Sequence, residues 1–112
     1  PLGTLFFEIV DDFDVPTVYD PNVVYFDKDM MHFPLHIRTW HVGDSFVPFG
    51  MNGRKKVSDL LIDKKIPIHQ KPSVLVVESG TTILWVVGQR RAQAAPITNN
   101  THKTLIIRYS HE

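Results

Sequence analysis

The sequence predicts a mainly β domain of the α+β class, a compact β-sandwich or barrel-like fold with one short helix. Short runs rich in β-branched and aromatic residues recur along the chain, and only one segment has convincing helical periodicity. At 112 residues the chain is large enough for one independent core and too small for two. We therefore expect a single domain over residues 1–112, built mostly from strands.

Six runs with strong β propensity predict the strands. They cover residues 4–10, 22–26, 35–40, 73–78, 82–87 and 104–109. The segment between the first two runs carries acids and two prolines, which predicts a loop or an edge segment. Ser79-Gly80-Thr81 separates the fourth run from the fifth and predicts a short hairpin.

One helix is predicted, over residues 56–65. Val57, Leu60 and Leu61 follow the i, i+3, i+4 spacing that places apolar side chains on one face of a helix. Pro67 cannot continue the helix, because proline has no backbone N–H to donate.

Composition excludes several classes of site and protein. The chain has no cysteine, so it has neither disulfides nor thiolate metal sites. No run approaches the roughly 18 apolar residues of a membrane helix, and the first residues do not resemble a signal peptide. These properties fit a cytoplasmic protein. Because the chain begins at Pro1 rather than Met, we expect a fragment or a processed product.

The net charge of zero conceals an uneven distribution along the chain. Residues 1–35 hold seven acids and one base, whereas residues 36–112 hold eleven bases and five acids. A basic segment of this kind favours an acidic partner such as a nucleic acid. The alternative is that the two segments pack together and their fields largely cancel.

The segment from Gly50 to Lys56, GMNGRKK, is the best candidate for a binding site. Its two glycines let backbone amides approach a ligand and tolerate positive φ. The predicted helix that follows presents unpaired N–H groups and the positive end of its dipole to anions. Arg54, Lys55 and Lys56 add charge that a phosphate backbone would neutralise. The alternative is a glycine turn whose basic side chains are simply solvated.

Familiar nucleotide and RNA motifs do not match the chain. Gly-x-x-Gly occurs in KH domains, where it joins two helices, whereas residues 46–49 are expected to be extended. The P-loop pattern is missing from the sequence. Ser79-Gly80-Thr81 lacks most of the S-G-G-x-D-S loop of pyrophosphatase-type ATP sites, so a turn explains it better.

No catalytic or metal site is predicted. The six histidines lack H-x-H and H-E-x-x-H spacing, and the serines have no recognisable nucleophile context. Asp44 and Asp63 could form an acid–base pair, but Asp44 is expected to order the turn after Gly43 and Asp63 to offset a nearby base. Trp85 lies in an apolar run and is expected in the core, so it is not a stacking platform for RNA bases.

Five clusters of residues occur in an order that a known family shares. They contain Arg38, Trp40, Gly43 and Asp44; Pro48, Gly50, Gly53, Lys55 and Lys56; Asp63, Lys65 and Pro67; Trp85, Val86, Gly88 and Arg90; and Thr98 with Lys103. On these clusters the chain resembles the C-terminal domain of bacterial tRNA(Ile)-lysidine synthetases, over roughly residues 22–108.

The resemblance implies a non-catalytic domain that grips tRNA near the acceptor stem, with a fold similar to a β-rich module of the phenylalanyl-tRNA synthetase β subunit. The parent enzyme would be a ligase that uses ATP and Mg to attach lysine to the wobble cytidine of tRNA(Ile). Its catalytic N-terminal domain is absent from this chain, which is expected to hold no cofactor. The implied partners are tRNA(Ile) and that catalytic domain, without a membrane, and the parent is compatible with a dimer.

The resemblance also indicates which residues bind RNA. The expected RNA contacts are Arg54, Lys55, Lys56, Lys65, Arg90 and Arg38, and the expected loop-shaping residues are Gly50, Gly53, Gly43 and Asp44. Residues 91–97, RAQAAPI, depart from the family pattern of an acidic pair, an aromatic residue and a basic residue, so residues 50–56 are the better candidate. The competing hypothesis is a β-rich protein-interaction module that binds no RNA.

Overall fold

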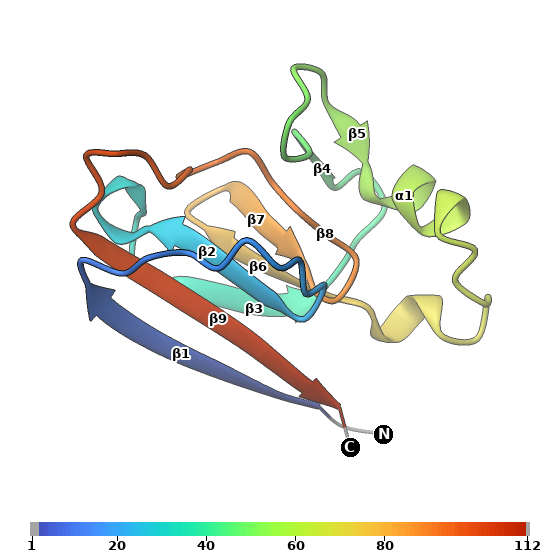
Figure 1. Cartoon of the computed structure of the whole chain (residues 1–112). Helices are drawn as coiled ribbons and strands as arrows, with labels where there is room; N and C mark the ends of the chain where they lie inside the picture. Colours follow the sequence, from blue (N-terminus) through green and yellow to red (C-terminus); the bar gives the residue numbers. More distant parts are fainter. Residues whose placement is uncertain (1–2, 112) are drawn as a thin grey trace. The chain divides into compact units, whose positions relative to one another are not determined.

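The computed structural model describes residues 3–111 and is mainly β, with one α-helix among the described residues (Figure 1). The strands are β1 (Gly3–Asp11), β2 (Val23–Asp27), β3 (Leu35–Thr39), β4 (Ser45–Phe46), β5 (Lys55–Lys56), β6 (Leu75–Ser79), β7 (Thr82–Val86), β8 (Arg90–Arg91) and β9 (Lys103–His111). The helices are α1 (Val57–Asp63) and the 3₁₀ segments η1 (Lys28–Met30) and η2 (Lys71–Ser73). The predicted class is confirmed, although none of the sheets formed by the described residues closes into a barrel.

The chain divides into two units, and the first combines its two ends. This terminal unit comprises residues 1–31 and 95–112, and its described part forms an antiparallel sheet in the order β1-β9-β2. The apolar run at residues 105–107 is at most 2% exposed, so the central strand carries the core of this sheet. Exposed ion pairs join β9 to β1, with Lys103 Nζ 2.8 Å from Asp11 Oδ1 and Arg108 Nη1 2.9 Å from Glu8 Oε1.

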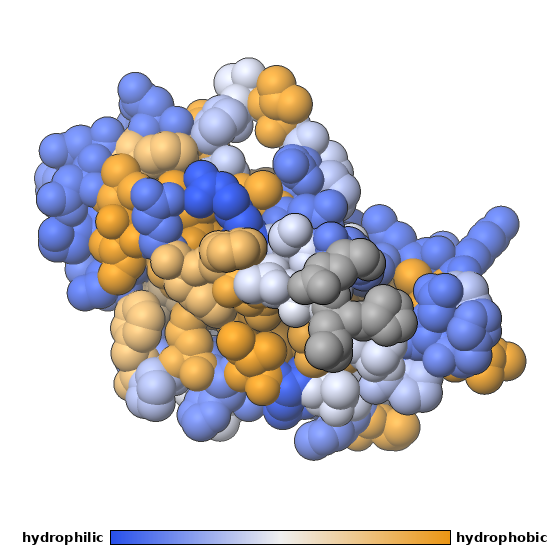
Figure 2. Space-filling model, turned by 90° about the horizontal axis from the view of Figure 1, so that it is seen from below, coloured by the Kyte–Doolittle hydropathy of each residue, from blue (hydrophilic) through white to orange (hydrophobic). Residues whose placement is uncertain are grey.

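Strand β1 is the edge of that sheet and carries exposed apolar side chains. Phe6 is 54% exposed, Phe7 42% and Ile9 50%. Figure 2 looks onto this strand from below and shows apolar surface gathered there. Long apolar edges of this kind are sites where another strand can pair.

The second unit, the central unit, comprises residues 32–94. Its main sheet has the order β3-β6-β7-β8, and a separate two-stranded ribbon pairs β4 with β5. One buried cluster joins the ribbon, the sheet and α1: Phe46, Val57, Leu60, Leu61, Val76, Ile83, Val86 and Ala92. The core of the central unit therefore lies directly beneath the ribbon that carries the basic loop.

Helix α1 buries the residues that its periodicity predicted. Val57, Leu60 and Leu61 are at most 3% exposed. The helix is shorter than the predicted range of 56–65, because Lys64 caps it and Lys65 adopts a positive φ of 56°. The N–H of Ile66 donates to the carbonyl of Leu61 at 3.0 Å, which satisfies a carbonyl of the last turn.

The hairpin predicted between the runs at residues 73–78 and 82–87 is confirmed, and it joins β6 to β7. Ser79 pairs with Thr82, and Gly80 has a φ of 58°, so glycine occupies the turn position that disfavours a Cβ. Trp85 is 1% exposed, as its apolar context predicted. The segment that resembled part of an ATP loop is therefore a tight turn.

Three strands were not predicted, and each has only two residues. They are β4, β5 and β8, and their pairing depends on long-range contacts that periodicity does not reveal. Within residues 3–111, no helix has the length and hydropathy that crossing a bilayer requires.

Candidate nucleic-acid interface

The basic residues are concentrated in the central unit. Residues 32–94 contain nine Lys and Arg against four Asp and Glu, a net charge of +5. Residues 1–31 and 95–112 contain three Lys and Arg against eight Asp and Glu, a net charge of −5. The charge asymmetry of the sequence therefore follows the boundary between the units, and a polyanion would favour the central one.

The basic loop is the tip of the ribbon formed by β4 and β5. Gly50 has a φ of 82°, and its N–H donates to Gln93 Oε1 at 2.7 Å. Gly53 does not have a positive φ, and a Cβ at this position would meet nothing within 4 Å. The geometry of the chain itself thus requires glycine at Gly50 but not at Gly53. Lys55 and Lys56 belong to β5 rather than to the helix that follows.

Arg54 is exposed, but its guanidinium group is held in one orientation. Nε and Nη2 donate to Ser45 Oγ at 3.0 and 2.7 Å, and Nη2 also donates to the Ser45 carbonyl at 3.0 Å. Nη1 makes no hydrogen bond within residues 3–111. The group is therefore pre-oriented, with one nitrogen left to donate to a ligand.

The two lysines that follow differ in their surroundings. Lys55 forms an ion pair with Asp63 of α1, which realises the expected role of Asp63 in offsetting a nearby base. The Lys56 side chain is exposed and has no hydrogen-bond or ion-pair partner in the part of the chain that the structure describes. An anion could therefore bind the Lys56 ammonium without breaking an internal bond, whereas at Lys55 it would compete with Asp63.

Arg38 is committed to two carboxylates. It donates to both oxygens of Asp44 at 2.9 and 3.0 Å and to both oxygens of Glu78 at 3.2 Å. The hydrogen bonds from Arg38 hold the pKa of Asp44 below its usual value. Asp44 also accepts a bond from the N–H of His41 at 2.7 Å, beside Gly43 with its φ of 98°. This cluster orders the turn between β3 and β4.

The remaining predicted contacts lie on the same unit. Lys65 is exposed at the end of α1, whereas Arg90 donates from Nη2 to the Phe49 carbonyl at 3.0 Å. The guanidinium of Arg91, which was not predicted, lies 4.5 Å from the centre of the Phe49 ring. Burial lowers the pKa of Arg91 to about 10. Periodicity could not predict this contact, because β8 has only two residues.

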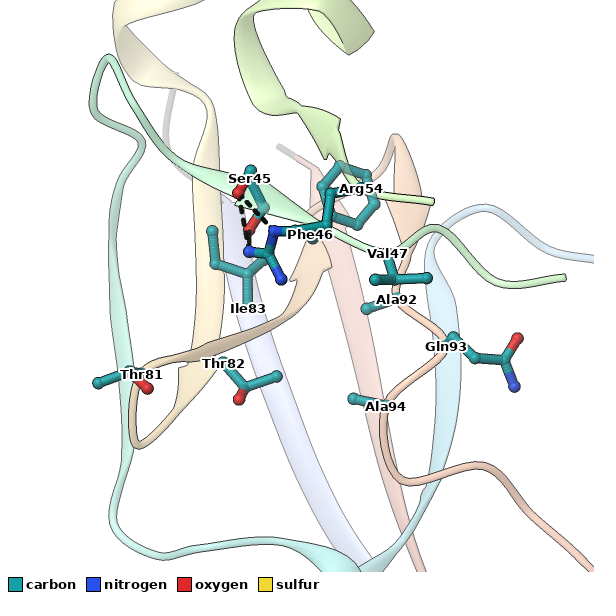
Figure 3. Close-up of a pocket in the computed structure, with 10 residues that line it drawn as sticks. All are labelled: Ser45, Phe46, Val47, Arg54, Thr81, Thr82, Ile83, Ala92, Gln93 and Ala94. Atoms are coloured by element: carbon teal, nitrogen blue, oxygen red, sulfur yellow. Dashed lines mark hydrogen bonds between the residues drawn. The ribbon is translucent and has the colours of Figure 1, made fainter. Parts of the chain in front are cut away.

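A pocket of about 450 Å³ lies beside Arg54 (Figure 3). Apolar side chains of Ile83, Ala92 and Ala94 line it, together with Thr82. The Arg54 guanidinium lies at its upper end in the view of Figure 3, where its unbonded nitrogen points away from Ser45. No group of three or more His, Asp or Glu within residues 3–111 is arranged to hold a metal ion.

A family model described as "TilS substrate C-terminal domain" matches residues 35–107, which include the ribbon, α1 and the pocket. The chain belongs to this family. A tRNA(Ile)-lysidine synthase from Parabacteroides distasonis is 38% identical over 109 residues, which cover 97% of this chain and 25% of that protein. The chain spans about a quarter of the length of this curated relative.

Two solved structures share the fold of this TilS C-terminal domain. A crystal structure of a TILS C-terminal domain superposes with a TM-score of 0.86 at 23% identity, covering 96% of this chain and 83% of that one. A fragment of the phenylalanyl-tRNA synthetase β subunit from Pyrococcus horikoshii superposes with a TM-score of 0.66 at 13% identity, covering 80% and 28%. Both fold relationships implied by the sequence resemblance are confirmed.

Proposed function

We propose that this chain is the tRNA-binding part of a tRNA(Ile)-lysidine ligase, which holds the acceptor stem while the chemistry takes place elsewhere in the same polypeptide. The observation that carries the proposal is the excess of bases in the central unit, with Arg54, Lys55 and Lys56 on its exposed ribbon. The name of the relatives, tRNA(Ile)-lysidine synthase, supports RNA as the polyanion.

The ribbon suits the surface of an RNA duplex. Side chains do not enter the narrow A-form major groove, so a stem is bound mainly through phosphates and ribose hydroxyls. The Lys56 side chain has no hydrogen bond or ion pair to lose within residues 3–111. To contact RNA, Lys55 would break its exposed ion pair with Asp63, which contributes only about 0–1 kcal/mol. Arg54 keeps its bonds to Ser45 and donates from its remaining nitrogen. Lys65 and Arg90 add charge on the same unit, whereas Arg38 contributes through the turn it orders.

The test replaces Arg54, Lys55 and Lys56 by Ala and measures binding of a tRNA(Ile) transcript. We expect the affinity to fall at least tenfold with little change in thermal stability, because the three side chains lie at the surface. The matched control replaces Lys28, Lys103 and Arg108 by Ala, which removes the same charge from the terminal unit. Equal losses for both variants would mean that net charge, not this ribbon, determines binding.

The same proposal assigns ATP, Mg and ligation to the remainder of a cytoplasmic parent enzyme. The described residues offer no ATP motif, and the chain spans only a quarter of its relative. Incubated with ATP, lysine and the tRNA(Ile) transcript, the 112-residue chain should release no AMP. The parent enzyme that contains this chain should release AMP under the same conditions. AMP release that follows the purified chain would overturn this assignment.

The exposed edge of β1 favours a second candidate function, pairing with a second copy of this chain. The N–H of Asp12 donates to the carbonyl of His102 at 2.8 Å, and β1 pairs with β9 without a shift in register. Because bonded pairs alternate along an antiparallel ladder, even-numbered residues of β1 bond to β9. The backbone groups of Leu5, Phe7 and Ile9 therefore point away from β9, toward the open edge.

Cross-linking tests this pairing without interference, because the chain has no cysteine. If the β1 strands of two copies pair around Phe7, the Cα atoms of the two Phe7 residues lie about 5.5 Å apart, within disulfide range. We then expect Phe7→Cys to form a covalent dimer on mild oxidation and Val18→Cys, at an 80% exposed site on the same unit, to remain monomeric. A wild-type mass of 12.9 kDa at all concentrations would exclude the pairing.

A further inference from the structure

The pocket beside Arg54 is a half-open hollow whose volume lies in the range of ligand sites. Ligand pockets typically enclose about 300–1,000 Å³ and combine apolar walls with a few oriented polar groups. This pocket encloses about 450 Å³ and lies entirely within the central unit. A duplex is convex, so its phosphates contact the rim of such a pocket but do not enter it.

The polar end of the pocket is formed by one guanidinium group. Three hydrogen bonds to Ser45 fix the plane of Arg54, as described above, and leave Nη1 to donate. Thr82, whose hydroxyl can donate or accept, also lines the pocket (Figure 3). An oriented guanidinium offers a phosphate oxygen a charge-assisted hydrogen bond without further ordering of its side chain.

The opposite wall is apolar and owes its space to small side chains. Ala92 is 2% exposed and Ile83 4%, and the side chains of Ala92 and Ala94 point inward (Figure 3). Both alanines belong to residues 91–97, the segment in which the chain departs from the family pattern. Larger or acidic side chains at these two positions would fill the pocket or repel an anion.

We propose that this pocket receives one unpaired nucleotide of the bound RNA, with its base against Ile83, Ala92 and Ala94 and its phosphate at Arg54. The inference rests on the proposed function, because RNA is the ligand that presents a base and a phosphate together. A paired base stays within its stack, so only an unpaired nucleotide can turn into the pocket. The base covers the part of this wall that is still exposed, chiefly at Ala94, while the phosphate binds the oriented cation.

Two RNA hairpins with the same stem test the inference. One is blunt, and the other carries a single-stranded 3′ extension next to the stem. We expect the wild-type chain to bind the extended hairpin about tenfold more tightly, the order of magnitude of one well-packed base. Ala94→Phe fills the pocket, so it should abolish this preference and leave the affinity for the blunt hairpin unchanged. Val42→Phe, at a 90% exposed site on the same unit, should keep the preference.

A nucleotide titration separates this inference from the proposed function. Cytidine 5′-monophosphate should shift the amide NMR signals of Thr82, Ala92 and Ala94 in the wild-type chain, and ribose 5-phosphate should shift them much less. Equal shifts with both compounds, or a preference that survives in folded Ala94→Phe, would overturn the pocket. If neither hairpin binds but the base-dependent shifts appear, the stem-binding function fails and the nucleotide pocket stands.

Discussion

Replacing Asp44 by Asn should destabilise the central unit more than replacing Glu78, the other carboxylate bound to Arg38, by Gln. The Asp44 carboxylate is 14% exposed and accepts bonds from both terminal nitrogens of Arg38 and from the N–H of His41. Its backbone carbonyl accepts the N–H of Val57 at 2.9 Å, where α1 begins. Asp44 therefore links β3, the turn that follows it and the helix.

The substitution keeps the shape of the side chain but turns one acceptor of Arg38 into an amide donor. A hydrogen bond to a charged group contributes about 1.5–3 kcal/mol, and partial exposure places this loss toward the lower end, near 1.5–2 kcal/mol. For a domain of this size, such a loss lowers the melting temperature by about 6–8 °C. Glu78→Gln is the matched control, because its bonds to Arg38 are longer, at 3.2 Å, so its loss should be smaller.

The effect of Asp44→Asn should also depend on pH. Arg38 lowers the pKa of Asp44 in the folded chain from its ordinary value of 3.8. Stability from this carboxylate is thus fully present above pH 3.8 and is lost as the pH falls through the lower, folded pKa. Urea unfolding followed by tryptophan fluorescence measures the difference at each pH. A difference below about 0.5 kcal/mol at pH 7, or one that persists unchanged at acid pH, would refute the reasoning.

Three further predictions concern the loops and the two units. Gly50→Ala should lower the free energy of unfolding by about 1 kcal/mol, because Gly50 has a φ of 82°. Gly53→Ala should leave the free energy of unfolding unchanged, and it should reduce tRNA affinity if RNA approaches the backbone at Gly53. Urea unfolding and tRNA titration of both variants check this, and equal destabilisation would contradict it. Lys65→Gly should stabilise the fold by about 1 kcal/mol, because Lys65 has a φ of 56° that disfavours a side chain. The same change should lower tRNA affinity, and a less stable variant would show that the backbone of Lys65 is not strained. If residues 1–112 form one cooperative domain, the amides of β6 and β9 should lose exchange protection at the same urea concentration, and separate transitions would identify two domains.

Local hydrophobic patterns in the sequence predicted most of the fold. The strand at residues 104–109 and the helix at 56–65 each contain their own apolar pattern, and both were found within a few residues of their predicted bounds. The two-residue strands β4, β5 and β8 contain too few residues for any period. Their existence depends on partners elsewhere in the chain, such as Lys56 paired with Ser45.

The candidate site was less accessible to sequence reasoning, because residue type does not specify a partner. Arg54, Lys55 and Lys56 form an unbroken basic triplet, yet their side chains differ in the structure. The Arg54 side chain binds Ser45, that of Lys55 pairs with Asp63, and that of Lys56 has no hydrogen-bond or ion-pair partner within residues 3–111. The pocket depends on the small size of Ala92 and Ala94, and the sequence does not show which distant residues they face across it. Motif order, in contrast, was sufficient to indicate the family.

The salt dependence of tRNA binding tests the central proposal most directly. Each phosphate contact releases counterions, so the slope of log affinity against log salt falls by about 0.7–0.9 for every contact removed. Replacing Arg54, Lys55 and Lys56 by Ala should therefore reduce the slope by about 2–3 relative to the wild-type chain, if all three contact phosphates. Coincident slopes and equal affinities for the two proteins would contradict the proposal and identify the ribbon as a solvated turn.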